Sequence, residues 1–110
     1  MKDCIFCKII AGEVPSEKVH HDNKKAVSFP SIHPARPGHM LVVPTEHHRW
    51  FWEMPDDIAN DLFKTARELA KDLKEKMKTD YVQLSIVGKE VPHVHLHLIP
   101  RMLTDHEAIT

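Results

Sequence analysis

The segment 55–78, PDDIANDLFKTARELAKDLKEKMK, constrains the fold more than any other part of this 110-residue chain. Its apolar residues recur every three or four positions, which places them in one stripe along an α-helix. Pro55 suits a first helical turn, and Asp56 and Asp57 favour the positive end of the helix dipole. The pattern predicts one long helix with a single apolar stripe, made of Ile58, Leu62, Ala66, Leu69, Leu73 and Met77.

Short segments with the composition of β-strands flank this helix. A further apolar segment, CIFCKIIAG, ends at Gly12 and predicts a short N-terminal helix. Because most connections are short, we expect the strands to pair antiparallel, with the long helix packed on the sheet. The length suits one domain, so we predict a single α+β domain over residues 1–110 with about five strands. The expected strands are 17–22, 25–30, 39–44, 81–88 and 93–100.

The charge balance narrows the class of partner. The chain has 15 Lys and Arg residues against 16 Asp and Glu residues, so it has no excess of positive charge to neutralise nucleic acid phosphates. No apolar run approaches the length of a membrane span, and MKDCIFCKII lacks the features of a signal peptide. We therefore expect a cytoplasmic protein that binds neither nucleic acid nor a membrane, although a small nucleotide remains a possible ligand.

The segment HVHLHLIP, residues 93–100, places a histidine at every second position. In a strand, His93, His95 and His97 share one face about 7 Å apart, and the aliphatic residues between them face the core. Such a row is compatible with a solvent-exposed face, with ligands of a shared metal ion, or with a nucleophilic imidazole between helpers. The chain has 10 histidines, so the spacing alone does not separate these interpretations.

The same segment resembles the His-x-His-x-His-x-x signature of the histidine triad (HIT) family of nucleotide hydrolases and transferases. Three stretches, CIFCKIIAGEVPSEKV, AVSFPSIHPARPGHMLVVPTEH and GKEVPHVHLHLIPR, resemble segments of the family's Hint branch. They occur in the family's order and cover most of the chain. The resemblance implies a HIT-like fold and a homodimer formed through the long helix and an adjoining strand.

The resemblance also implies a reaction and roles for four histidines. His95 would attack the α-phosphorus of a purine nucleotide ester, anhydride or phosphoramidate and form a covalent nucleotidyl-histidine, which water resolves without a metal ion. The backbone carbonyl of His93 would orient His95, and His97 would contact the phosphate and the leaving group. His39 matches the family's fourth histidine and would face the triad from a neighbouring strand; the alternative is a plain polar residue at a strand start.

Further positions match the family's nucleotide-binding residues, with departures. Ser31 stands where most members have an aspartate that binds the ribose hydroxyls, and Lys89 and Glu90 replace a glutamine and a hydroxyl residue near the phosphate. Ser31 and Glu90 favour an alternative, a nucleotide-binding or scaffold protein with little catalysis. Another enzyme class, a metal-dependent hydrolase with the triad as ligands, also stays open. The implied nucleotide-binding residues are Ile5, Phe6, Phe29, Ser31, Ile32, Gly88, Lys89 and Glu90, of which the apolar ones equally suit a plain core.

Cys4 and Cys7 have the Cys-x-x-Cys spacing of half a zinc site. A redox motif with this spacing would follow a strand, and no strand pattern precedes Cys4. Some bacterial HIT proteins combine such a pair with the histidine after the central strand and the first triad histidine, which here are His47 and His93. The resemblance therefore implies a structural zinc ion bound by these four residues, with two free, partly buried thiols as the alternative.

One aromatic cluster, RWFW at residues 49–52, belongs to none of these motifs. Aromatic side chains bury large apolar areas, and they are common both in cores and at contacts between proteins. Core packing or a dimer contact therefore explains the cluster better than a role in substrate binding.

Overall fold

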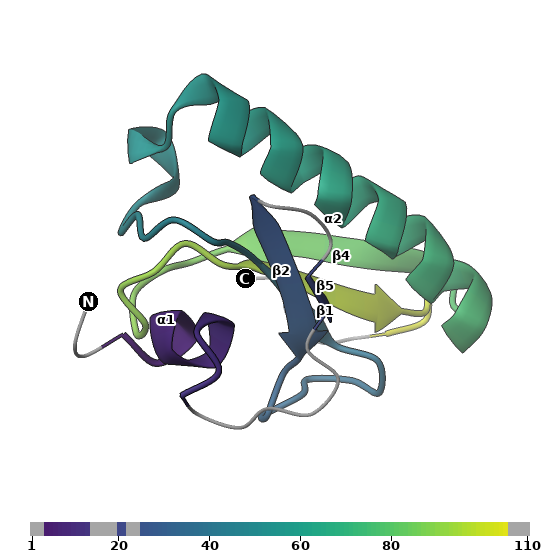
Figure 1. The fold of residues 1–110 in the computed structure, drawn as a ribbon. Helices are drawn as coiled ribbons and strands as arrows, with labels where there is room; N and C mark the ends of the chain where they lie inside the picture. The colour runs from purple at the N-terminus through teal and green to yellow at the C-terminus, as the bar shows by residue number, and fades with distance from the viewer. Residues whose placement is uncertain (1–3, 14–19, 22–24, 106–110) are drawn as a thin grey trace.

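The computed structural model describes residues 4–13, 20–21 and 25–105, which form one antiparallel sheet and its helices (Figure 1). The strand order is β1-β2-β3-β5-β4, so the histidine-bearing strand lies between the central strand and the strand after the long helix. In chain order the elements are α1 (Ile5–Ile10), β1 (His20–His21), β2 (Ala26–Pro30), β3 (Met40–Pro44), a 3-10 turn (Phe51–Glu53), α2 (Asp56–Met77), β4 (Tyr81–Ile86) and β5 (Leu96–Arg101).

The predicted α+β class, the antiparallel sheet and both helices are confirmed. Four strands have five or six residues, and the first, the edge segment β1, comprises the two described residues of the predicted strand 17–22. Residues 17–19 and 22 of that prediction lie outside the described residues. No helix among the described residues is long and apolar enough to cross a membrane.

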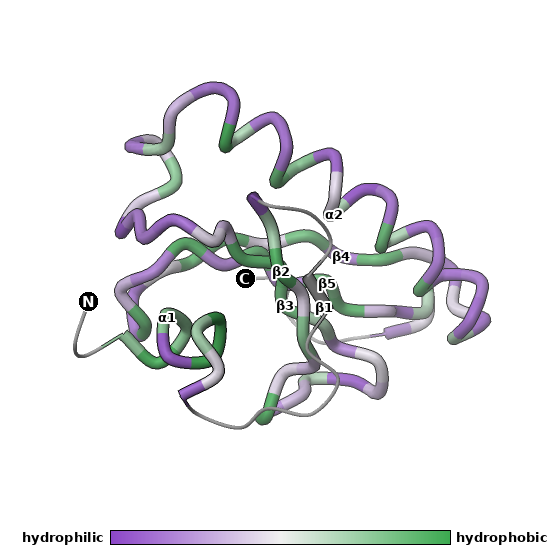
Figure 2. Tube along the Cα trace, in the orientation of Figure 1, coloured by the Kyte–Doolittle hydropathy of each residue, from purple (hydrophilic) through white to green (hydrophobic). Residues whose placement is uncertain are grey.

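The long helix α2 covers one face of the sheet. Its hydrophobic positions turn toward the strands and its hydrophilic positions turn away (Figure 2). It ends at Lys78, which adopts a left-handed conformation with φ 54° and donates its N–H to the carbonyl of Lys74. The predicted stripe is confirmed, because the core on this face joins helix residues to alternate strand residues: Ala26, Val42, Leu62, Ala66, Leu73, Val94, Leu96 and Leu98.

The opposite face of the sheet packs against α1. Phe6 is the buried residue of this short helix, and its ring lies 5.5 Å from that of Phe29, centroid to centroid. The helix gives way to a turn that contains Gly12 at φ 79°, as the glycine predicted. A second core forms here from Cys4, Phe6, Val27, Phe29, Leu41 and Val43. Because Val94, Leu96 and Leu98 face α2, the intervening histidines point to this α1 side.

The prediction that the last strand begins at His93 is wrong; β5 begins at Leu96. Two hydrogen bonds explain the later start. The ring N–H of His93 donates a hydrogen bond to the carbonyl of Pro44, at the end of β3. The Val94 N–H donates to the carbonyl of His48, beyond β3. Residues 93–95 are therefore held beside β3 by a side chain and a loop carbonyl instead of a regular ladder.

Candidate active site and metal centre

The three alternating histidines separate into two environments. His93 is fully buried, while the rings of His95 and His97 contact each other edge to face with centroids 4.9 Å apart. This distance is shorter than the 7 Å predicted from the strand alone, because the two rings lean together. Phe6 of α1 packs edge-on against His95, at 5.0 Å between centroids, and against His93 at 6.0 Å.

The position of the proton on His95 follows from one hydrogen bond. Its Nδ1 lies 2.8 Å from the backbone carbonyl oxygen of His93, and a carbonyl only accepts, so Nδ1 carries the proton. In the neutral ring, Nε2 then has a free lone pair. This arrangement matches the role that the resemblance gave to the His93 carbonyl, and it leaves His95 with one nitrogen able to act as a nucleophile.

The positions of the protons on His39 and His97 follow from their hydrogen bonds in the same way. The backbone N–H of Ala35 donates to Nδ1 of His39 at 3.0 Å, so the proton of a neutral His39 is on Nε2. That Nε2 lies 3.0 Å from Nδ1 of His97, which must accept and therefore keeps its own proton on Nε2. His97 thus presents an N–H donor beside the lone pair of His95.

Burial keeps these imidazoles neutral. It lowers the pKa of His97 to about 4, helped by the neighbouring His95 and His39. It also lowers the pKa of His39, where the positive charge of Arg101 acts in the same direction. Burial outweighs two opposing effects on the pKa of His95, namely its hydrogen bond to the His93 carbonyl and the charge of Glu90. Near pH 7 all three rings are therefore neutral, as the assignment of their protons requires.

A cavity of about 300 Å³ lies beside His39 and His97, between α1, β2 and the β4–β5 connection. His97, His39 and six of the predicted nucleotide-binding residues line it, whereas Gly88 and Lys89 do not. Phe29 is also fully buried, so it serves both the core and the cavity wall, while Ile32 is 83% exposed at the rim. The six predicted residues in the wall are Ile5, Phe6, Phe29, Ser31, Ile32 and Glu90.

Gly88 and Lys89 belong to a connection that the sequence did not predict in detail. Gly88 has φ 73°, and a Cβ on it would lie 3.5 Å from the ring of Trp50. Trp50 stacks on Trp52 with parallel rings 5.2 Å apart, and Phe51 and Trp52 are 49% and 66% exposed. The expectation of core packing for this aromatic cluster is therefore wrong for Phe51 and Trp52, and a dimer contact stays a prediction.

The four predicted metal ligands come together from three separate parts of the chain. The ligand atoms of Cys4, Cys7, His47 and His93 all lie within 4.8 Å of one another. Nδ1 of His93 is 3.2 Å from Sγ of Cys4 and 3.4 Å from Sγ of Cys7, which in turn is 3.3 Å from Nδ1 of His47. Among the described residues this is the one group of histidine, cysteine or acidic side chains arranged to hold a metal ion.

These four donors fit zinc. The His93 Nε2–H donates to the Pro44 carbonyl at 2.8 Å, so the Nδ1 lone pair faces both sulfurs, as a metal ligand requires. Ligand distances of about 2.0–2.3 Å in a tetrahedron give neighbouring donors about 3.3–3.8 Å apart, close to the separations found. Burial raises the pKa of Cys7 to about 11, with Cys4 adding to the effect, so a bound cation would have to displace its proton.

The family model for the HIT domain matches residues 11–103. The chain belongs to the HIT family. The HIT-like protein MJ0866 of Methanocaldococcus jannaschii is 40% identical over 110 residues, 96% of this chain and 84% of that protein. Adenosine 5'-monophosphoramidase HNT1 of Saccharomyces cerevisiae is 39% identical over 103 residues, 89% of this chain and 62% of that protein. The crystal structure of SMU.412c from Streptococcus mutans has a TM-score of 0.89 and 36% identity, over 100% of this chain and 73% of that one.

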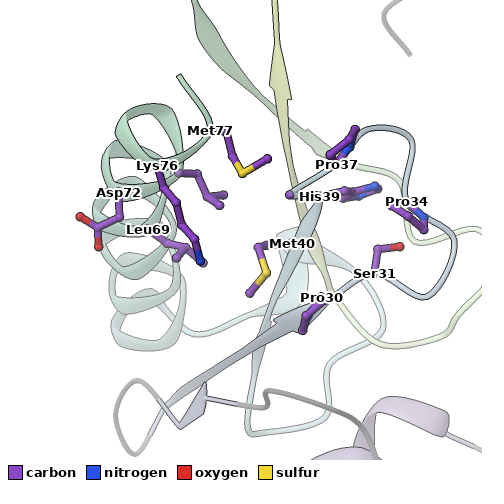
Figure 3. A pocket seen from close by; sticks show the side chains of 12 residues that line it. Pro30, Ser31, Pro34, Pro37, His39, Met40, Leu69, Asp72, Lys76 and Met77 are labelled. Atoms are coloured by element: carbon purple, nitrogen blue, oxygen red, sulfur yellow. The ribbon is translucent and has the colours of Figure 1, made fainter. Parts of the chain in front are cut away.

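This HIT domain has a second, larger cavity of about 440 Å³ on the α2 side (Figure 3). Met40, Leu69 and Met77 give it an apolar wall, and it shares Ser31 and His39 with the histidine cavity. The loop between β2 and β3 therefore separates two hollows. Sequence reasoning did not single out this cavity, because its walls are ordinary apolar positions of a helix and a strand.

The HIT site also uses residues outside the sequence predictions. Ile9, Leu41 and Val91 line the histidine cavity, and the N–H of Ala35 orders the His39–His97 pair. Leu41 could have been found, because it lies two residues after His39 and so faces the same side of β3. Ala35 acts through its backbone, which leaves no signal in its side chain.

Proposed function

We propose that this protein hydrolyses purine nucleoside 5'-phosphoramidates and related nucleotidyl esters or anhydrides through a covalent intermediate on His95. The observation that carries the proposal is the position of the proton on each ring. Hydrogen bonds place it on Nδ1 of His95, which leaves a lone pair on Nε2, and on Nε2 of His97. A nucleophile and a hydrogen-bond donor thus stand side by side as neutral imidazoles. The family, and its relatives named adenosine 5'-monophosphoramidase, support this reaction class.

The proposed first step exchanges one bond at phosphorus for another. Nε2 of His95 forms a bond to the α-phosphorus, and the bond from phosphorus to the leaving nitrogen or oxygen breaks. The leaving group accepts a hydrogen bond from the Nε2–H of His97 and takes its proton from solvent, so His97 stays neutral. As the His95 ring becomes positively charged, the His93 carbonyl stabilises its Nδ1–H.

In the second step, water attacks the phosphorus of the nucleotidyl-histidine. The oxygen of the water binds phosphorus as the bond to His95 breaks, and one proton of the water returns to solvent, while the Nε2–H of His97 donates a hydrogen bond to the reacting group. The products are a nucleoside monophosphate and the starting protonation state of both histidines. The chemical step uses only groups of this chain and solvent, so the proposal includes no catalytic metal ion.

The cavity beside His97 has the character of a nucleoside pocket. The proposal places the base against the apolar residues Ile5, Phe6 and Phe29, and the ribose near Ser31, which offers a hydroxyl in place of a carboxylate. Glu90 lines the same cavity and puts a negative charge near His95, which opposes a phosphate and favours a cationic leaving group such as an amine. Gly88 and Lys89 do not line this cavity, so their contact with the nucleotide stays a prediction.

The second part of the proposal is a structural zinc ion bound by Cys4, Cys7, His47 and His93. The donor set and the His93 lone pair support it. Such an ion would join three segments that are distant in the sequence: the start of α1, the segment after β3 and the segment before β5. It would therefore hold the N-terminal segment against the rest of the fold. A metal ion bound by all three triad histidines is not compatible with this arrangement, since His93 turns toward the two cysteines.

A homodimer formed through α2 and a neighbouring strand remains part of the proposal. The strand next to it at the sheet edge, β4, exposes Leu84 and Ile86 by 42% and 37%, and Val87 after it by 55%. An unpaired edge strand with exposed apolar residues favours association with another chain. Sedimentation or light scattering measures the mass directly; a monomer at all concentrations contradicts this part.

One observation favours the second candidate function, a nucleotide-binding protein with little catalysis. Glu90 lines the cavity, and its negative charge opposes the negative charge that develops at the phosphate and leaving group during the reaction more than it opposes a bound nucleotide. This candidate predicts tight binding of adenosine monophosphate with no turnover of phosphoramidates, esters or anhydrides.

The test of the main proposal is hydrolysis of adenosine 5'-phosphoramidate, with mass spectrometry of acid-free quenched protein for the covalent nucleotidyl adduct. His95→Ala is expected to abolish both the turnover and the adduct. The matched control is His48→Ala, which removes another imidazole, one hydrogen-bonded to Glu46 at the surface. Equal turnover in His95→Ala and in the control contradicts the role of His95.

A further inference from the structure

The loop between β2 and β3 acts as one stiff unit. Its two ends close on each other, because the Ser31 N–H donates to the His39 carbonyl at 3.0 Å and the His39 N–H donates to the Arg36 carbonyl at 3.1 Å. Pro34 and Pro37 restrict the backbone between these bonds. A contact that holds one residue of this loop therefore sets the position of the whole loop, including the Ala35 N–H.

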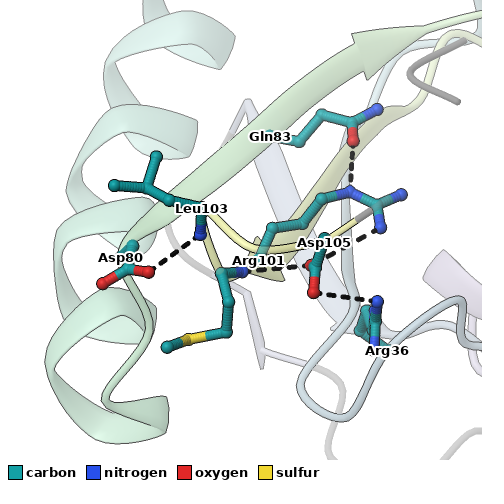
Figure 4. A network of polar contacts seen from close by, with 7 residues as sticks. Arg36, Asp80, Gln83, Arg101, Leu103 and Asp105 are labelled. Atoms are coloured by element: carbon teal, nitrogen blue, oxygen red, sulfur yellow. Dashed lines mark hydrogen bonds and ion pairs between the residues drawn. The ribbon is translucent and has the colours of Figure 1, made fainter. Parts of the chain in front are cut away.

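That contact is made by Asp105, after the end of β5 (Figure 4). Its Oδ1 lies 3.0 Å from the Arg36 guanidinium, and its side chain is 12% exposed. Its Oδ2 accepts the Met102 N–H at 3.0 Å and lies 4.0 Å from the guanidinium of Arg101. The carboxylate thus joins the loop of His39 to the end of the strand that bears His97.

Arg101 completes the link. It is 7% exposed, and its Nε–H donates to the side-chain oxygen of Gln83 on β4, so its position in the sheet is fixed. Its positive charge also acts on His39. Asp105 therefore lies between two guanidinium groups, one fixed in the sheet and one belonging to the loop. Without the carboxylate, the repulsion between these two cations is less compensated, and the loop is held less firmly against the sheet.

We propose that Asp105 is a positioning residue: by holding Arg36 against Arg101, it keeps the Ala35 N–H on His39 and so fixes the proton of His97 on Nε2. The consequence for catalysis rests on the proposed function, whereas the consequence for the protons does not. With the Ala35 N–H displaced, nothing forces Nδ1 of His39 to be the acceptor. His39 can then carry its proton on Nδ1, and His97 must donate from Nδ1 and present a lone pair to the cavity.

That exchange removes the hydrogen-bond donor but keeps both rings neutral and in place. His95 and His97 would then both offer lone pairs, and the leaving group would lose the hydrogen bond from the Nε2–H of His97. The expected kinetic effect is a fall in kcat, accompanied by a rise in KM, because Ser31 and Ile32 of the same loop line the cavity.

The test compares Asp105→Asn with Asp80→Asn in the full chain as purified. Asp80 is the matched control, because its Oδ2 accepts the Leu103 N–H at 2.8 Å and so ties the same C-terminal turn without touching Arg36. Nitrogen-15 NMR of the imidazoles distinguishes Nδ1–H from Nε2–H and needs no substrate. Asp105→Asn is expected to show Nδ1–H on His39 and His97 and a fall of at least about tenfold in kcat. Asp105→Glu is expected to restore the Nε2–H forms.

A second variant, Arg36→Gln, breaks the same link from the loop side and is expected to give the same ring protons. The proposal is overturned if folded Asp105→Asn or Arg36→Gln keeps Nε2–H on His97, or if Asp80→Asn changes the protons equally. If the unmodified protein turns over no nucleotide conjugate, the proposed function fails, but the ring protons still decide the role of Asp105.

Discussion

His93 and His95 stand two residues apart on one segment, yet their surroundings prepare them for opposite tasks. Both nitrogens of His93 are engaged, one by the Pro44 carbonyl and one by the sulfurs of Cys4 and Cys7. His95 has one nitrogen bound to a carbonyl and one left over. In each ring, a backbone carbonyl accepts a hydrogen bond from one N–H and so leaves the lone pair on the other nitrogen. The surroundings of that lone pair differ: the lone pair of His93 faces two thiols, whereas the ring of His95 contacts that of His97, which lines the cavity.

The largest expected effect separates the two histidines by activity. His95→Ala is expected to lower turnover of adenosine 5'-phosphoramidate by at least about 10³-fold, because no other group in the pair can form the bond to phosphorus. The variant is expected to keep its zinc content and its melting temperature within a few degrees, measured by metal analysis and calorimetry. Loss of zinc in this variant would contradict the division of roles.

The second prediction expects the opposite pattern, a loss of zinc and stability with little loss of activity. Cys7→Ser removes one sulfur of the metal cluster and is expected to reduce bound zinc and to lower the melting temperature by at least about 10 °C. Below that temperature, the folded fraction is expected to keep a kcat within a few-fold of the original, since Cys7 does not touch the His95–His97 pair. A melting temperature unchanged by both the variant and a strong chelator would favour two free thiols over zinc.

The fold could largely be predicted from the sequence, whereas the separate roles of the triad histidines were implied by the resemblance to the HIT family. The period of α2 and the alternation of HVHLHLIP each bury one set of apolar residues, and burial is what a sequence pattern records best. The start of β5 could not be predicted, because the His93 ring competes with the sheet for the Pro44 carbonyl. The link from Arg36 to Asp105 was equally hidden, since two charged residues far apart in sequence give no periodic signal.

The third prediction concerns pH, where the two regions also differ. His97 ionises near pH 4 in the folded protein against an ordinary pKa of 6.5, so the unfolded chain binds this proton first. Its contribution to stability is therefore complete above pH 6.5 and is lost as the pH falls from 6.5 toward 4. We expect kcat to show no loss from His97 protonation until the pH approaches 4, while zinc affinity declines earlier because protons compete for the thiolates. Stopped assays and zinc titrations across this range measure both.

The smallest expected effect concerns the charge beside His95. Glu90→Gln removes a carboxylate from the cavity and is expected to lower KM for anionic nucleotide substrates by about two- to fivefold, more at low salt than at high salt. Glu53→Gln, at an exposed position outside the cavity, is the control of equal charge change. A higher KM for amine-bearing substrates in Glu90→Gln would show that this carboxylate recognises the leaving group; equal KM values in both variants would assign it no role.

The stacked pair of Trp50 and Trp52 gives this protein a built-in optical probe. These are the chain's only 2 tryptophans, and the Trp50 ring lies against Gly88 in the connection that also holds Glu90. All indole emission, and the paired signal of two parallel rings in near-ultraviolet circular dichroism, thus originates at one place beside the cavity. Displacement of that connection by an arriving ligand would change both signals, so binding can be followed in the unlabelled protein, separately from any turnover.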